Sequence, residues 1–120
     1  VDLRHSGRTF TPRFSDSIII YEFNWQQAAE STHGIAHYRI YDNGSRQTAW
    51  DFTVGGSNYQ GRQTAFYRRS SWGTTPQELK IMVREYGANN EAQVHMTAHW
   101  DGTGTDNDSA SFGRIMEWRS

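Results

Sequence analysis

The chain has 120 residues, the usual size of one domain, so we expect a single domain with one hydrophobic core across residues 1–120. Its 12 basic and 13 acidic side chains lack the basic excess that nucleic acids and anionic membranes attract, so neither is an expected partner. There is no cysteine, which excludes disulfides, thiol catalysis and zinc–thiolate sites.

The start of the chain and the length of its apolar runs indicate whether it is processed and whether it can cross a membrane. The longest uncharged apolar run is Ile18–Tyr21, far short of the roughly 20 residues that cross a bilayer. No signal-peptide pattern opens the chain, and Val1 stands where a Met usually begins a protein. We expect no membrane insertion, and a chain that is processed or excised from something longer.

Short segments rich in β-branched or aromatic residues alternate with clusters of Gly, Asn, Asp and Ser, and none has an apolar repeat at helical spacing. This pattern predicts an all-β domain of the sandwich or barrel type. In chain order the eight expected strands are Arg8–Phe14, Ser17–Gln26, Gly34–Asp42, Arg46–Thr53, Arg62–Ser70, Glu78–Tyr86, Ala92–Trp100 and Ser111–Trp118.

The clearest turn is Asn43-Gly44, since both residue types tolerate the positive φ of a tight hairpin. It should join the third and fourth strands. The Gly-rich connections Val54–Gly61 and Asp101–Ser109 should lie on the surface as contact loops. We interpret Trp25–Gly34 as a loop, since it is too short for a stable helix.

Several strands carry large apolar residues on both faces. In the last strand, Phe112, Met116 and Trp118 alternate with Ile115, and Gly34–Asp42 and Glu78–Tyr86 show the same two-sided pattern. A chain this short has little left to cover a second face, so the pattern favours a partner subunit. The alternative is scattered surface aromatics, which are common in proteins.

Three stretches carry a resemblance to a known family. The run Phe10–Ile20 includes a Thr-Pro step, a small polar turn and an isoleucine-rich strand; Arg39–Ser45 forms a hairpin signature; and Ser111–Trp118 ends with a Met-Glu step. Together they resemble the head domains of bacteriophage fibres and virions, and the match spans nearly the whole chain. Pro76 matches a proline that precedes the sixth strand in that family, whereas Asp101–Ser109 is longer and more acidic.

The resemblance implies an eight-stranded antiparallel jelly-roll sandwich, similar to the tumour-necrosis-factor and complement heads, that forms a homotrimer on a stalk. In that fold the first, third, sixth and eighth strands form the sheet that faces the trimer axis. It implies a non-enzymatic virion appendage, on a tail or a capsid, that contacts a receptor on the host surface. The residues expected at the subunit interface are Tyr38, Ile40, Met82, Tyr86, Phe112, Met116 and Trp118.

Two histidine pairs, His33/His37 and His95/His99, have a spacing that would share a metal on a helix. On a strand that spacing separates them by about 13 Å, so a solvated, pH-sensitive sheet face is favoured over a metal site. The loop Asp101–Asp108 has the oxygen ligands that calcium prefers but not the full EF-hand spacing, so calcium and a plain solvated loop both stay open. No obligatory cofactor or metal is expected.

No catalytic residues are predicted. The glycine-flanked serines match no nucleophile motif, and nothing pairs the carboxylates in a cleft. A receptor or sugar site would need aromatic planes beside Asp, Asn and Gly in loops. The residues that supply these types are Asn58, Tyr59, Trp72, Asp101, Asp106 and Asn107. The alternative function is therefore a free-standing, carbohydrate-binding, lectin-like β-sandwich.

Overall fold

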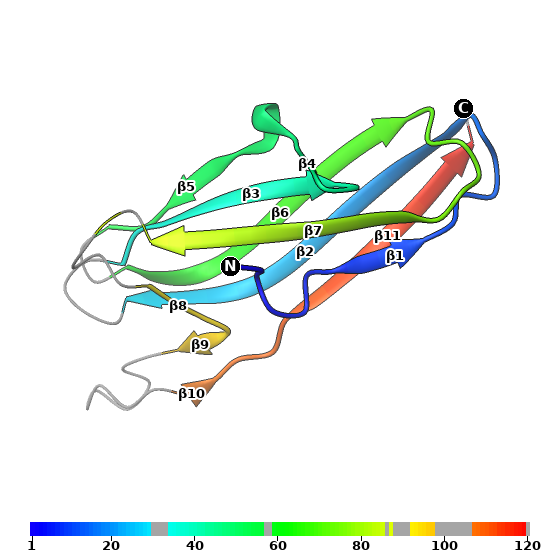
Figure 1. Cartoon of the computed structure of the whole chain (residues 1–120). Helices are drawn as coiled ribbons and strands as arrows, with labels where there is room; N and C mark the ends of the chain where they lie inside the picture. The colour runs from blue at the N-terminus through cyan, green and yellow to red at the C-terminus, as the bar shows by residue number, and fades with distance from the viewer. Residues whose placement is uncertain (30–33, 57–58, 86, 88–91, 98–106, 120) are drawn as a thin grey trace.

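The computed structural model describes residues 1–29, 34–56, 59–85, 87, 92–97 and 107–119. These residues form two main antiparallel sheets that face each other and a third sheet of only two short strands, so the all-β sandwich prediction is confirmed (Figure 1). In chain order the elements are β1 (Arg8–Phe10), β2 (Ser17–Ala29), β3 (Ala36–Asp42), β4 (Ser45–Arg46), the 3₁₀ turn η1 (Thr48–Trp50), β5 (Phe52–Val54), β6 (Gln60–Ser70), β7 (Gln77–Glu85), β8 (Ala92–Val94), β9 (Met96–Thr97), β10 (Asn107–Asp108) and β11 (Phe112–Arg119).

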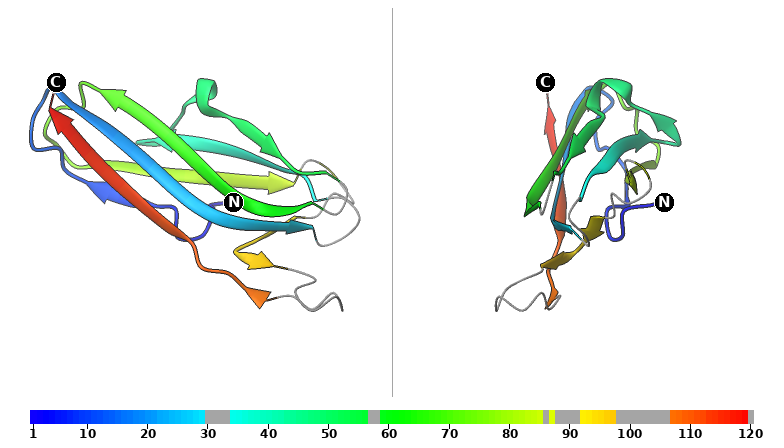
Figure 2. Two further views of the ribbon diagram at one scale, coloured as in Figure 1. Left: turned by 180° about the vertical axis from the view of Figure 1, so that it is seen from behind. Right: turned by 90° about the vertical axis from the view of Figure 1, so that its left-hand side faces the viewer.

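One sheet has the order β1-β7-β3-β4, with β5 also paired to β3; the other has the order β11-β2-β6, with β8 also paired to β2. The view from behind in Figure 2 brings β11, β2 and β6 to the front. The resemblance placed the eighth predicted strand with the first, third and sixth. That placement is wrong, because β11 pairs with β2 along Ser17–Asn24, in the other sheet.

The aromatic residues carry the core, as the low apolar and high aromatic content requires. From β2, Tyr21, Phe23 and Trp25 point inward at 0% exposure, and Tyr38 of β3 meets Trp25 with ring centroids 4.9 Å apart. From Ser17 to Gln27, strand β2 alternates buried odd residues with half-buried even ones, the pattern of a strand packed on one face. It continues to Ala29, so the predicted loop from Trp25 is wrong over its first five residues.

Two polar clusters join the sheets, one near each end of β3. The buried Gln27 side chain accepts a hydrogen bond from the Tyr38 hydroxyl (2.5 Å) and donates to the carbonyl oxygens of Gly34 (3.0 Å) and Val54 (3.2 Å). At the other end of β3, the Tyr67 hydroxyl and the Arg69 guanidinium both donate to Oδ2 of Asp42, at 2.8 and 2.7 Å. Each cluster links β3 or its neighbours to the opposite sheet, so polar bonds as well as apolar packing hold the layers together.

The predicted Asn43-Gly44 hairpin is confirmed. Asn43 has φ 48° and Gly44 has φ 81°, and the turn pairs Asp42 with Ser45. The Asn43 side chain also accepts a hydrogen bond from the Glu78 backbone N–H at 2.8 Å. The turn is therefore anchored to β7 as well as shaped by its own residues.

Candidate functional site

A groove lies where one edge of the sandwich is open. Strands β11 and β8 pair with the same edge of β2, β11 as far as Asn24 and β8 from Gln27 onward. His95, at the bend between β8 and β9, fills the gap, since its N–H donates to the Gln26 carbonyl at 2.8 Å. Its own carbonyl accepts the Ser109 N–H at 2.7 Å. Backbone bonds on both sides therefore hold the His95 ring at this edge.

The opposite wall of the groove comes from the N-terminal segment. Its first three residues pair with β7, and β1 resumes that pairing at Arg8. Between them Arg4–Gly7 bulges away, with His5 at φ 67°. The bulge is anchored by Ser6, whose carbonyl accepts the Tyr21 hydroxyl at 2.6 Å, and by Arg8, which donates to the carbonyl oxygens of His5 (2.7 Å) and Gly7 (2.8 Å). It is thus a built feature of the fold.

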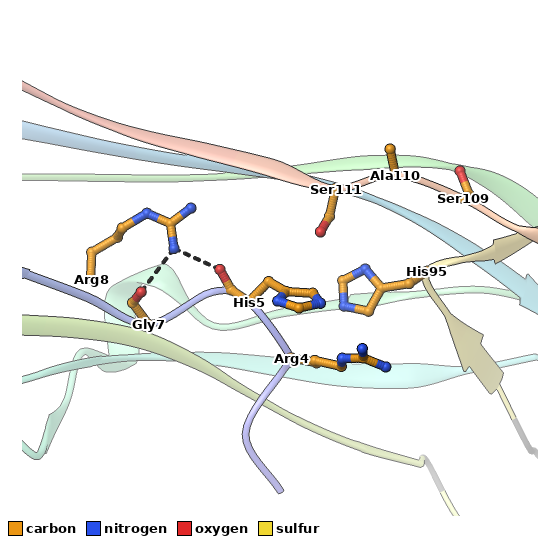
Figure 3. Close-up of a pocket in the computed structure, with 8 residues that line it drawn as sticks. All are labelled: Arg4, His5, Gly7, Arg8, His95, Ser109, Ala110 and Ser111. Atoms are coloured by element: carbon orange, nitrogen blue, oxygen red, sulfur yellow. Dashed lines mark hydrogen bonds between the residues drawn. The ribbon is translucent and has the colours of Figure 1, made fainter.

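The two walls meet through two histidines from opposite ends of the sequence. The His5 and His95 rings lie edge to face with centroids 5.8 Å apart, and Phe23 contacts His95 from the core side at 6.3 Å (Figure 3). The groove has a volume of about 700 Å³, within the usual range of small-molecule sites. Its lining residues are Arg4, His5, Gly7, Arg8, His95, Ser109, Ala110 and Ser111.

The described lining of the groove is electropositive. Among the described residues it carries the guanidinium groups of Arg4 and Arg8, two imidazoles and no carboxylate. Both ring nitrogens of His95 are shielded from solvent and have no hydrogen-bond partner among the described residues. Burial lowers the pKa of His95; the Arg4 backbone, close to the ring but outside hydrogen-bond geometry, raises it, and the neighbouring charges of His5 and Arg4 lower it again. An anion in the groove would reverse that balance.

A second exposed feature is the outer surface of the β11-β2-β6 sheet, here called the β11 face. It presents Phe112 at 60% exposure, Trp118 at 58% and Phe66 at 42%. The half-buried Ile18 and Ile20 of β2 lie directly opposite Trp118 and Met116, so the apolar residues adjoin one another. An ion pair between Arg114 and Glu22 (2.9 Å) crosses the same face.

The predicted interface residues divide between inside and outside. Phe112, Met116 and Trp118 lie on the β11 face, whereas Tyr38 and Ile40 are 0% exposed. The interface prediction is wrong for those two, because the even residues of β3 face the other sheet and not a partner. Met82 is half-buried on the outer side of β7, and Tyr86 lies outside the described residues.

The predicted receptor residues are not brought together in the described part of the chain. Trp72 is 4% exposed, its Nε1 donates to the Arg69 carbonyl at 2.6 Å, and the Arg69 guanidinium covers its ring at 4.0 Å. Its prediction as an exposed sugar platform is therefore wrong. Tyr59 is half-buried and its hydroxyl accepts a bond from Gln63. Asn107 lies in β10, and Asn58, Asp101 and Asp106 lie outside the described residues.

Sequence reasoning missed the groove. It placed His95 on a solvated strand face with His99, but the strand is interrupted at His95, whose φ is 64° and whose ring turns toward the core. His99, His33 and most of the loop Asp101–Asp108 lie outside the described residues. No local signal links His5 to His95, because their contact depends on the pairing of distant strands.

No protein-family model matches the chain, and no curated protein matches it. Within the described residues, no helix has the length and apolar character needed to span a membrane. The same residues contain no group of three or more His, Asp or Glu side chains placed to hold a metal ion.

Proposed function

We propose that the chain is the non-enzymatic head of a virion fibre, on a tail or a capsid, that assembles as a homotrimer and contacts the host cell surface. The observation that carries the proposal is the β11 face, where Phe112 and Trp118 are more than half exposed beside Met116, Ile18 and Ile20. The resemblance of the termini and the hairpin to fibre heads supports it from the sequence.

The β11 face favours a protein partner on physical grounds. Large aromatic side chains each bury about 150–250 Å² when covered, and burial contributes about 25 cal/mol per Å² of apolar surface. The outer side of the other sheet carries Arg39, Lys80 and Arg84, and none of the exposed large apolar residues of the described chain lies in its strands β3 or β7. Two further copies of the chain are the proposed cover, because the family resemblance implies a trimer. A jelly-roll connection stays a prediction only for the strands other than the last, because β11 lies in the other sheet; a crystal structure of the assembled head would test it.

The lectin-like alternative is weaker. Its two aromatic platforms were Tyr59 and Trp72, and the second is buried under Arg69. Receptor contact in the proposed function therefore does not rest on those rings. Detection of the chain in purified virions by mass spectrometry tests the virion location.

Light scattering coupled to size exclusion tests the assembly. At micromolar concentration we expect a mass three times the 13.8 kDa of the chain. The double variant Phe112→Ser, Trp118→Ser should elute as a folded monomer, since it removes the most exposed rings of the β11 face. Tyr41→Ser, which removes a half-buried ring from the outer side of β3, is the matched control and should stay trimeric. A monomeric wild type, or a trimeric double variant, would refute the assembly.

A further inference from the structure

We propose that the groove between the N-terminal bulge and His95 binds the carboxylate or sulfate group of an acidic saccharide, with Arg4, His5 and His95 as its anion-binding side chains. The inference rests on the proposed function, since it names the chemical class of the host receptor. It assigns receptor contact to the open edge of the sandwich, whereas the proposed function assigns the β11 face to contacts between copies of the chain.

Among the described residues, several arginines pair with a carboxylate, whereas those of the groove do not. Arg46, Arg69 and Arg114 each pair with a carboxylate, at Asp51, Asp42 and Glu22. Among the described residues, no carboxylate pairs with Arg4 or Arg8. Arg8 is held by two backbone carbonyl groups, which fix its direction without neutralising its charge. An oxyanion would supply the missing countercharge through charge-assisted hydrogen bonds.

His95 provides the second, independent observation. Buried polar atoms in proteins nearly always have a hydrogen-bond partner, yet neither nitrogen of this ring has one among the described residues. The two histidines also have positive φ, 67° for His5 and 64° for His95, and such backbone strain tends to occur at functional sites. The unbonded ring nitrogens and the positive φ angles are both explained if the His95 ring donates a hydrogen bond to a ligand that binds in the groove.

The dimensions favour a saccharide over a free inorganic anion. A volume of about 700 Å³ is far more than a sulfate or phosphate ion fills, and it lies within the range of small-molecule sites. Across from the histidines, Ser111 lines the groove, and Figure 3 shows its side chain directed toward the two rings; the Ser109 hydroxyl accepts a bond from Arg62 at 3.3 Å. Serine hydroxyls both donate and accept hydrogen bonds, as sugar hydroxyls require.

Binding should strengthen as the pH falls. Among the described residues, the titratable and charged groups that face His95 are Arg4 and His5 from the bulge and Arg8 from β1, and none of them is acidic. Protonation converts a ring with one donor into one with two, so the bound anion gains a hydrogen bond and a charge. We expect about tenfold tighter binding at pH 5.5 than at pH 7.5.

Calorimetric titration of the full chain tests the ligand class. Sialyllactose supplies a carboxylate, a sulfated heparin disaccharide supplies sulfate, lactose is the neutral control and sodium sulfate is the free anion. At least one acidic sugar should bind with a dissociation constant at or below about 1 mM at pH 5.5. Lactose should not bind, and free sulfate should bind at least tenfold more weakly. No binding of either acidic sugar, or equal binding of free sulfate, would overturn the inference.

Two variants locate the site. Arg4→Gln removes an exposed cation that no described carboxylate pairs with, and His95→Asn removes the ring while keeping a residue type that tolerates positive φ. Each should weaken binding at least tenfold, and His95→Asn should also flatten the pH dependence. The control Arg84→Gln makes the same charge change on the outer side of β7 and should bind like the wild type. Equal losses in all three variants would mean a diffuse charge effect and no site.

The same samples separate this inference from the function on which it rests. A trimer that attaches to host cells but ignores acidic sugars would remove the groove inference and leave the fibre head standing. A monomer that binds them in the groove would do the opposite.

Discussion

Gln27 and His95 lie close to each other in the fold, but they differ in the hydrogen bonding of their polar side-chain atoms. The Gln27 amide is fully buried and bonded on both its oxygen and its nitrogen, to groups of the facing sheet. The His95 ring is shielded from solvent with neither nitrogen bonded among the described residues. The difference indicates that the Gln27 amide stabilises the sandwich, whereas the nitrogens of the His95 ring can bond to a ligand.

The largest effect on stability is expected from replacing Gln27, whose side-chain oxygen and nitrogen are both hydrogen-bonded. Gln27→Ala removes three hydrogen bonds, leaves the Tyr38 hydroxyl and the Gly34 and Val54 carbonyl oxygens without their partner, and opens a cavity between the sheets. We expect the free energy of unfolding to fall by about 3–4 kcal/mol in urea denaturation at fixed protein concentration.

The neighbouring Gln26→Ala is the control for this substitution. Gln26 is half-buried, and among the described residues its side chain makes only one weak bond, of 3.4 Å, to the Gln27 carbonyl. Its loss should change stability by about 0.5 kcal/mol or less. Similar losses at both positions would mean that the Gln27 cluster does not hold the sheets together.

Asp42 is an intermediate case. Its Oδ2 accepts bonds from Tyr67 and Arg69, while its Oδ1 has no partner among the described residues. Asp42→Ala would leave the buried Tyr67 hydroxyl without an acceptor, but Arg69 keeps its contact with Trp72 and a side chain that is 38% exposed. We expect a loss of about 2 kcal/mol.

The surface pair Arg46–Asp51 gives the comparison for Asp42. Its arginine side chain is 40% exposed, so Asp51→Ala should cost less than about 1 kcal/mol by thermal or chemical unfolding. If the two aspartate variants lost the same stability, the buried cluster would have no special role in joining β3 to β6.

Strand alternation predicted the sandwich because one face of each sheet is buried, and the Asn43-Gly44 turn was readable because its chemistry is local. Alternation says which residues share a face but not which face is the core. That is why Tyr38 and Ile40 were assigned to a partner when they pack inside. The same limit hid the pairing of β11 with β2, since register between distant strands has no local signature.

The groove was beyond prediction for a related reason. His5 and His95 are distant in sequence, and each reaches the groove through a backbone departure, a bulge at one and an interrupted strand at the other. The prediction for Trp72 was wrong in the opposite sense. A surface position was predicted, but Arg69 covers the Trp72 ring and the ring N–H is hydrogen-bonded. Residue type alone did not distinguish a ring that contacts a ligand from a ring that closes a core.

The smallest effect on stability is expected from His95→Asn, and this variant gives the most direct contrast with Gln27→Ala. The variant removes a ring that makes no side-chain hydrogen bond among the described residues, so at pH 7.5 the free energy of unfolding should change by about 0.5 kcal/mol or less. Because burial lowers the pKa of His95, the unfolded chain takes up a proton near pH 6.5 before the folded chain does. Without ligand, the wild type should therefore lose stability as the pH falls below about 6.5, a loss that His95→Asn escapes. Urea denaturation at pH 7.5 and 5.5 measures both. A wild type whose advantage over the variant grows on acidification would contradict the assignment of His95 as a half-buried ring whose nitrogens have no partner among the described residues.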